Sequence, residues 1–323
     1  MTKSNNYFYV GGNCIFYDFP LINNKGGGLL MQVASSNVSN LQYLNATNII
    51  SNMESLITFY KNKTQNPKLT GDLKEDFFVA LNSLQYAQIP NEKGKIKIQF
   101  QNEELCNRLI QMGAIPEEAT KENNHIYTQT KQEEITDNIN KALELLRILH
   151  PELNRLIKEL IGTILCFDVK GFGGGSASGV IGLIWFSPPS NWSIVDYAEA
   201  LYHEFIHNSI FLEDMINGVL PKQEVCETEE ALTTSAILKR KRPLDRAYHS
   251  AGVSIGLIHF YHMMNDNKKA DSFLDSLKVT LSELETKKYL LRNRGVQNLD
   301  GMLNFVEVLD YNSISKALNT AKM

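Results

Sequence analysis

The residues best suited to chemistry in this chain are His203, Glu204 and His207, which stand in the order His-Glu-Phe-Ile-His. Two histidines four positions apart project from the same face of an α-helix, so both imidazoles can reach one metal ion while Glu204 lies beside it. With only 7 histidines in 323 residues, such a pentapeptide arises by chance in roughly one chain in a hundred of this composition. The pattern therefore predicts a metal site, and two core histidines satisfied by their neighbours are the alternative.

The residues around this pentapeptide have the pattern of a helix. Ser193 and Asp196 have the spacing of a capping box, with Asp in place of the usual Glu. Gly218 can adopt the left-handed conformation that ends helices, and Pro221 follows it. Between these signals, apolar residues recur at helical period: Ala198, Leu201, Tyr202, Phe205 and Ile210. We expect one helix here, with the pentapeptide in its middle.

A catalytic metal needs a third protein ligand, and the sequence offers two kinds. The first kind is a carboxylate on a predicted helix after Pro221, which would complete the ligand set of a thermolysin-like zinc peptidase; the candidates are Glu224, Glu227, Glu229 and Glu230. The second kind is histidine. A predicted helix from about Leu244 to Met264 carries His249, His259 and His262, of which the last two point away from the direction of His249. Only one of these three is expected to bind metal, and His259 and His262 are expected to be polar residues near the helix end.

Composition and charge restrict the class of protein. A net charge of -4 gives no reason to expect nucleic acid or an anionic membrane as a partner, although Lys239-Arg240-Lys241-Arg242 is a local basic cluster. The 4 cysteines are widely spaced, which argues against a zinc ribbon or a dense disulfide framework and fits a reducing compartment. The sequence shows neither a signal peptide at its start nor an apolar stretch that could span a membrane. We expect a cytoplasmic protein.

The remaining periodicities predict a predominantly helical α+β fold, in which a metal-binding helix bundle is joined by a small β element. Strands are expected at residues 95–100, where polar and apolar residues alternate, and in the apolar run 180–186. The Gly-rich stretch from Gly171 to Gly179 lacks the Gly-Lys-Ser/Thr of a phosphate loop and is expected to be a turn before an edge strand. Further helices are expected at residues 40–61, 76–88, 102–112, 133–148 and 153–164.

The polar segment from Gly113 to Thr130 is the candidate domain boundary. It separates residues 1–130, an N-terminal region for which we consider a role in substrate recognition, from residues 131–323, the predicted metal-binding catalytic domain. Residues 1–34 are rich in aromatic residues and glycine and are expected to be irregular or short-stranded.

Four short motifs lie between about residue 130 and residue 265: Pro151-Glu152-Leu153, Ser176-Ala177-Ser178-Gly179-Val180-Ile181, His203-Glu204-Phe205-Ile206-His207-Asn208, and Arg242-Pro243-Leu244 followed by His249. In combination they resemble the α-ketoglutarate-dependent HExxH-type peptide β-hydroxylases, HExxH-motif proteins associated with the modification of ribosomally made peptides (RiPP biosynthesis). Many peptidases share the metal-binding pentapeptide. The discriminating part is therefore Arg-Pro-Leu with a histidine five residues after Leu244.

The resemblance implies a dioxygenase whose iron(II) is held by His203, His207 and His249, with α-ketoglutarate and O₂ as cosubstrates. Its substrate would be a peptide, free or in a leader-bearing precursor, hydroxylated at a β-carbon. α-Ketoglutarate, also called 2-oxoglutarate, chelates iron through its 1-carboxylate and keto oxygen, so its distal carboxylate needs a cation. Arg242 offers a planar bidentate donor for it, and Arg246, one helical turn before His249, is the alternative.

The role of Glu204 separates this hypothesis from its runner-up, a zinc metallopeptidase of the HExxH type. In a peptidase, Glu204 would be the general base that activates a Zn(II)-bound water. In an oxygenase it would support a ligand or contact the substrate. A third hypothesis is a non-catalytic peptide-binding protein with a structural metal. Structural sites usually have four protein ligands, whereas this sequence supplies three good candidates, which favours an open catalytic site.

Overall fold

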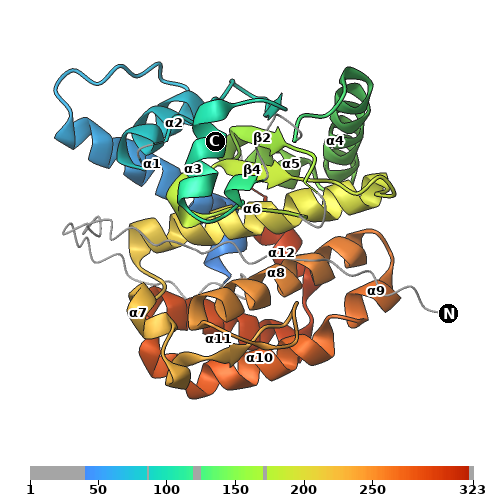
Figure 1. Cartoon of the computed structure of the whole chain (residues 1–323). Helices are drawn as coiled ribbons and strands as arrows, with labels where there is room; N and C mark the ends of the chain where they lie inside the picture. Colours follow the sequence, from blue (N-terminus) through green and yellow to red (C-terminus); the bar gives the residue numbers. More distant parts are fainter. Residues whose placement is uncertain (1–40, 86, 119–124, 170–172, 320–323) are drawn as a thin grey trace. The chain divides into compact units, whose positions relative to one another are not determined.

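The computed structural model describes residues 41–85, 87–118, 125–169 and 173–319. The predicted irregular region 1–34 lies outside these described residues, as does part of the Gly-rich stretch. Of the described residues, 64% are helical and 7% lie in strands, so the prediction of a predominantly helical α+β fold is confirmed. Figure 1 shows the helices and the small sheet.

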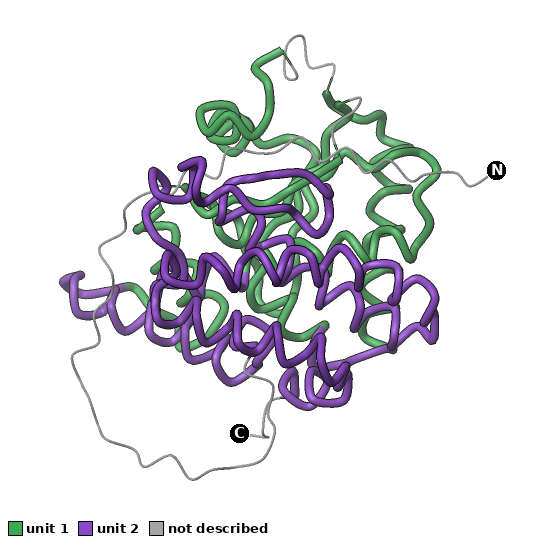
Figure 2. Tube along the Cα trace, turned by 90° about the horizontal axis from the view of Figure 1, so that it is seen from below, with its two compact units in different colours: residues 1–15, 68–148, 154–208 green, residues 16–67, 149–153, 209–323 purple. Residues whose placement is uncertain are grey.

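The chain divides into two compact units (Figure 2). Unit 1 contains Lys68–Ile148 and Asn154–Asn208, and unit 2 contains Leu149–Leu153, Ser209–Met323 and the described part of Phe16–Pro67. The proposed division of the chain near residue 130 stays a prediction.

Unit 1 contains a sheet of four strands in the order β1-β2-β4-β3. The strands β1 (Lys97–Gln99), β2 (Thr163–Cys166) and β4 (Leu183–Phe186) are parallel, and β3 (Gly174–Gly175) pairs with β4 in the antiparallel direction. Every residue of β2 and β4 is buried, as expected for parallel strands covered on both faces. Strands are confirmed in both predicted regions. The expectation that the Gly-rich stretch is a turn before an edge strand was wrong, because the edge strand β3 lies inside this stretch and β4, which follows it, is an inner strand of the sheet.

The helices of unit 1 are α2 (Leu73–Leu84), α3 (Glu103–Gln111), α4 (Gln129–Leu149) and α5 (Pro151–Leu160), the last two of which overlap unit 2 at Leu149–Leu153. The prediction that a helix continues to Ile164 was wrong, because α5 ends at Leu160 and β2 begins at Thr163. The residues after Leu160 form an apolar run, and periodicity alone does not distinguish a buried strand from a buried helix in such a run.

A buried lysine ties three parts of unit 1 together. Lys74, in the first turn of α2, has no exposed surface, and its ammonium donates hydrogen bonds to the carbonyls of Lys95, Lys158 and Ile161. Burial lowers the pKa of Lys74 to about 8. These carbonyls lie just before β1 and at the end of α5, so one side chain satisfies backbone acceptors that would otherwise be buried without a donor.

Unit 2 is mostly helical. Its helices are α1 (Ala46–Lys63), α7 (Gln223–Cys226), α8 (Leu244–Met263), α9 (Asn267–Asp271), α10 (Leu274–Thr286), α11 (Asn293–Val308) and α12 (Tyr311–Ala317). The predicted helix over about 244–264 is confirmed as α8, which is buried nearly all round and packs against α9, α10, α11 and α12 (Figure 1). A hairpin of β5 (Thr233–Thr234) and β6 (Lys241–Arg242) precedes α8.

Two expectations for unit 2 were wrong. The predicted helix after Pro221 is only the short α7, because the backbone is extended at Thr228 before a single 3₁₀ turn, Glu229–Ala231. His259 is not a polar residue at the helix edge. It has no exposed surface, and its Nε2 lies 2.8 Å from the hydroxyl of Ser315 on α12. The sequence of α8 alone does not reveal that α12 covers this histidine.

Cys106, Cys166 and Cys226 are buried, and none of these cysteines of the described chain forms a disulfide. No helix among the described residues combines the length and apolar character needed to cross a membrane.

Candidate metal site

The predicted metal-binding helix is present as α6 (Ile194–Asn217). Its start has the predicted capping interaction: the backbone N–H of Ser193 donates to Asp196 Oδ2 at 2.7 Å, and the N–H of Asp196 donates to Ser193 Oγ at 3.3 Å. Its end is followed by Gly218 with a φ of 68°, the left-handed conformation expected there. Local sequence signals therefore define both ends of the helix.

His203 and His207 point their ring tips at one another. Their Nε2 atoms lie 3.2 Å apart and their ring centroids 5.0 Å apart. Two nitrogens that each lie about 2.1 Å from one ion, at tetrahedral or octahedral angles, are separated by roughly 3.0–3.4 Å. The observed separation fits a shared metal ion, and without a metal it also allows one ring to donate a hydrogen bond to the other.

Burial keeps both imidazoles in the neutral form. It lowers the pKa of His203 well below its usual value, with a further contribution from the nearby His207. Burial also lowers the pKa of His207 to about 4. Neutral imidazole is the form that binds metal ions, so neither histidine has to lose a proton at neutral pH before it can act as a ligand.

The carboxylate of Glu204 is buried, with 2% of the residue exposed. Its Oε2 accepts a hydrogen bond from the hydroxyl of Ser176 at 2.7 Å, and its Oε1 lies 3.9 Å from Nε2 of His203. Ser176 directly follows the edge strand β3. The sequence analysis gave Ser176 no role of its own. The signal that could have found it is its position in the Gly-rich stretch, as the first residue of the motif Ser176-Ala177-Ser178-Gly179-Val180-Ile181.

Asn208, which follows the second histidine, joins α6 to the sheet of unit 1. It is fully buried, its side-chain amide donates to the carbonyl of Glu204 at 2.8 Å, and its side-chain oxygen accepts from the N–H of Gly182 at 2.7 Å. Gly182 has a φ of 87°, and a Cβ at this position would come within 2.6 Å of Phe78. Glycine is therefore required where the chain enters β4. Sequence analysis also missed this role of Asn208.

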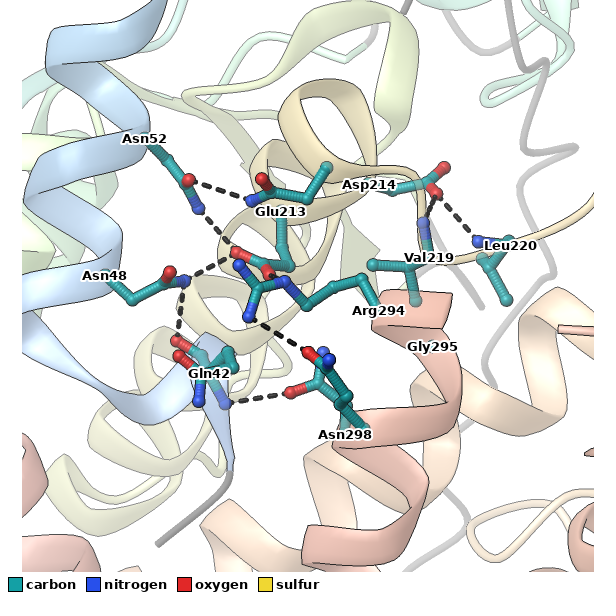
Figure 3. Close-up of polar contacts among 12 residues, drawn as sticks. Gln42, Asn48, Asn52, Glu213, Asp214, Val219, Leu220, Arg294, Gly295 and Asn298 are labelled. Atoms are coloured by element: carbon teal, nitrogen blue, oxygen red, sulfur yellow. Dashed lines mark hydrogen bonds and ion pairs between the residues drawn. The ribbon is translucent and has the colours of Figure 1, made fainter. Parts of the chain in front are cut away.

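The C-terminal part of α6 is held within unit 2 by a buried carboxylate (Figure 3). Glu213 Oε2 accepts from the side-chain amides of Asn48 and Asn52, each at 2.5 Å, and Glu213 Oε1 lies 2.9 Å from Nε of Arg294. One residue further, Asp214 Oδ1 accepts from the N–H groups of Val219 and Leu220. These contacts connect α6 with α1 and α11, and they close the chain reversal that follows α6.

The other predicted site residues lie in unit 2. His249 on α8 is buried, and its ring centroid lies 4.6 Å from that of Phe211. Arg242 lies on β6 and Arg246 in the first turn of α8. Between them in sequence is the buried Asp245. Burial raises the pKa of Asp245, while the positive charges of Arg246 and Arg242 act in the opposite direction. The two candidate arginines therefore share one carboxylate as a neighbour.

The structure brings His203, Glu204 and His207 together on α6. The alternative carboxylate ligands are all exposed: Glu224, Glu227, Glu229 and Glu230. Within the described ranges, no group of three or more His, Cys, Asp and Glu side chains lies closely enough to hold a metal ion. The identity of the third ligand, His249 or a carboxylate, stays a prediction.

Comparison of the chain with models of known protein families and with characterised protein sequences finds no match.

Proposed function

We propose that this protein is a non-haem iron(II) and α-ketoglutarate-dependent dioxygenase that hydroxylates a β-carbon of a residue in a ribosomally made peptide. Its iron would be held by His203, His207 and His249, and its cosubstrates would be α-ketoglutarate and O₂. We further propose that it acts in the cytoplasm on a peptide or a leader-bearing precursor, with neither nucleic acid nor membrane as a partner.

The observation that carries the proposal is the pair of neutral imidazoles, of the buried His203 and the half-buried His207, whose Nε2 atoms lie 3.2 Å apart. Their spacing suits one ion, and their neutrality suits a metal site that also accepts a dianionic chelating ligand. The motif Arg242-Pro243-Leu244 with His249 favours an oxygenase over other metal-dependent enzymes, on the resemblance described above.

The roles of the chain's own residues follow from their chemistry. When bound, iron would supply the oxidation of an unactivated C–H bond, which no amino-acid side chain performs. Arg242 or Arg246 would bind the distal carboxylate of α-ketoglutarate through a planar, bidentate guanidinium. Glu204, held by Ser176, lies on the Nε2 side of His203 and would there contact the substrate, and the burial of His203 and Glu204 would exclude water.

The runner-up is a zinc metallopeptidase of the HExxH type, and the placement of Glu204 favours it as the second candidate. The carboxylate is buried and lies 3.9 Å from Nε2 of His203. A general base that activates a Zn(II)-bound water needs such a position close to the metal ligands. Under this alternative, Glu204→Gln would abolish hydrolysis of a generic peptide while Zn(II) binding persists.

The two functions can be separated without knowledge of the substrate. Metal-free protein is titrated under anaerobic conditions with Fe(II) and then with α-ketoglutarate, and the visible charge-transfer band of a chelated 2-oxo acid is recorded. We expect the band in the wild-type protein and its loss in His203→Ala, His207→Ala and His249→Ala. The band should weaken in whichever of Arg242→Ala and Arg246→Ala removes the cosubstrate ligand.

His262→Ala is the matched control, because His262 stacks on Tyr311 at a centroid distance of 3.8 Å and has no place in the proposed site. A band that persists in His249→Ala would refute the ligand assignment. If no band forms while Zn(II) binds tightly and supports peptide cleavage, the protein is a peptidase.

A further inference from the structure

The loop of residues 176–182, which joins β3 to β4, is bound to α6 at both of its ends. At its first residue, the hydroxyl of Ser176 donates to Glu204 Oε2 at 2.7 Å. At its last residue, the N–H of Gly182 donates to Asn208 Oδ1 at 2.7 Å. Glu204 and Asn208 are four positions apart, so they lie one turn apart on the same face of the helix. The 176–182 loop therefore follows one turn of α6, and all these residues belong to unit 1.

This loop is a tightly packed extension of the sheet. Three of its residues are buried, with at most 2% of each exposed: Ala177, Val180 and Ile181. Gly182 is also buried, and its carbonyl accepts from the N–H of Gly162, just before β2, at 2.9 Å. Because close-packed segments yield little, the two contacts at the ends of the loop define how α6 lies against it.

Asn208 determines how α6 is turned against the 176–182 loop. It is fully buried and uses both groups of its amide: Nδ2 donates to the carbonyl of Glu204 at 2.8 Å, and Oδ1 accepts from Gly182. Side-chain tips lie roughly 5–6 Å from a helix axis, so a rotation of about 10° moves a tip by about 1 Å. A shift of that size along the 2.7 Å bond between Ser176 and Glu204 would lengthen it beyond hydrogen-bond distance.

The carboxylate of Glu204 connects this contact with the metal ligands. Its Oε2 is bound to Ser176, and its Oε1 lies 3.9 Å from Nε2 of His203, the atom that would bind the metal. A negative charge so close to a cation in a buried site attracts it, and groups that surround metal ligands typically change metal affinity about 10- to 100-fold when they are removed. If Ser176 lost its bond, the carboxylate could turn away from His203 and metal affinity would fall.

We propose that Asn208 is a positioning residue of the metal site: it holds α6 against the 176–182 loop, so that Ser176 keeps the carboxylate of Glu204 beside the metal ligand His203. The proposal rests on the metal site of the proposed function. Asn208 forms no bond to the metal in this scheme, and it acts through Ser176 and Glu204.

The test uses Co(II) as the probe, because its visible absorption depends on the geometry of its ligands. Its dissociation constant is measured with metal-free, full-length protein by competition with a chelator. We expect Asn208→Ala and Ser176→Ala each to raise this constant about tenfold, the lower end of the range for groups around metal ligands. Both variants should change the Co(II) absorption in the same way, because both release the same carboxylate.

Asn82→Ala is the matched control for a loss of stability without a change at the site. Asn82, on α2, also bridges backbone groups with both parts of its amide: it donates to the carbonyl of Ile89 at 3.1 Å and accepts from the N–H of Ile89 at 3.1 Å. Its removal should lower thermal stability and leave the affinity for Co(II) and its absorption as in the wild type. An equal loss of affinity in Asn82→Ala and Asn208→Ala would refute the positioning role.

A double-mutant cycle tests whether Asn208 acts through Ser176. Without the hydroxyl of Ser176, the position of the loop no longer affects Glu204, so the double variant should bind Co(II) within about twofold of Ser176→Ala alone. A merely structural role of Asn208 predicts independent losses, which multiply to about a hundredfold.

Asn208→Asp keeps the proposal testable even if Asn208→Ala does not fold. Its carboxyl oxygen can still accept from the N–H of Gly182, and any negative charge it carries attracts a cation. We therefore expect Asn208→Asp to bind Co(II) at least as tightly as the wild type, and weaker binding would contradict the proposal.

Failure of the metal site and failure of the positioning role give different results. If the wild-type protein does not bind Co(II), the metal site of the proposed function is wrong and the role of Asn208 is wrong with it. If the wild type binds Co(II) and Asn208→Ala binds it equally well, only the positioning role is wrong. If the losses in Ser176→Ala and Asn208→Ala multiply, Asn208 does not act through Ser176.

Discussion

Ser176 stabilises the folded protein through one hydrogen bond to a buried carboxyl group. Its hydroxyl donates to Oε2 of Glu204 at 2.7 Å, and the acceptor residue is 2% exposed. A buried acceptor that loses its donor costs about 1–3 kcal/mol, because bulk water does not replace the donor.

We therefore expect Ser176→Ala to lower the free energy of unfolding of the metal-free protein by about 1–3 kcal/mol. Urea denaturation followed by circular dichroism would measure this difference. Ser282→Ala, at an exposed position of α10, should stay within about 0.5 kcal/mol of the wild type. Equal stability of Ser176→Ala and the wild type would mean that the carboxylate of Glu204 does not depend on this hydroxyl.

The sequence predicted some of the candidate site residues and missed others. His203, Glu204 and His207 were found because their chemistry depends on spacing within one helix, which the sequence states directly. Ser176 and Asn208 were not, because Ser176 is 28 positions from Glu204 and Gly182 is 26 from Asn208. A contact between such distant positions is set by the packing of the sheet and α6, and no local pattern encodes it.

At the scale of elements, Glu213 makes the last turns of α6 depend on two other helices. Its carboxylate accepts from Asn48 and Asn52 on α1 and pairs with Arg294 on α11. Removal of this acceptor leaves amide and guanidinium donors without their partner, which costs more than the loss of one ordinary contact.

We expect Glu213→Ala to lower the free energy of unfolding by about 2–4 kcal/mol. This loss is smaller than that for a fully buried ion pair, because Arg294 is partly exposed and water screens its charge. Glu213→Gln, which keeps the shape and one acceptor oxygen, should lose less. Glu307→Ala on the exposed surface of α11 is the control. Chemical denaturation of the wild type and the three variants would measure these free energies of unfolding. Equal losses of stability in Glu213→Ala and Glu307→Ala would contradict the structural role of the buried carboxylate.

Helices and strands could be predicted where the residues at their ends or their own periodicity give a clear local signal. Caps and an apolar stripe define α6, and period-two alternation defines the region of β1. The strand β2 was taken for the end of a helix because its residues are apolar on both faces, which removes the alternation by which a strand is recognised. For α7 the error was the opposite: a longer helix was expected than is present, because a composition that favours a helix does not ensure that the helix continues.

On the scale of the whole molecule, buried histidines make folding sensitive to acid. Burial, together with the charges of His150 and His262, lowers the pKa of His259 from 6.5 to about 3. Burial likewise lowers the pKa of His207 to about 4. Between these values and about 6.5, the unfolded chain binds protons that the folded protein excludes, so stability is lost as the pH falls through this range.

The free energy of unfolding of the metal-free protein should therefore fall between pH 6.5 and pH 4, with His259 alone contributing about 1 kcal/mol for each pH unit. Urea titrations at several pH values would measure the slope. His259→Gln should reduce it, whereas Ser315→Ala, which removes the hydrogen-bond partner but keeps the imidazole, should retain it. An unchanged slope in His259→Gln would show that this histidine is not the acid-sensitive group.

Burial makes Cys106, Cys166 and Cys226 unreactive towards oxidants and metal ions. Thiolates, rather than thiols, react with oxidants and compete for metal ions. Burial raises the pKa of Cys106 and Cys166, and it raises that of Cys226 to about 12, so at neutral pH these sulfurs stay protonated. Within the described chain, these three thiols would therefore neither compete with an imidazole for a metal ion nor react readily with an oxidant.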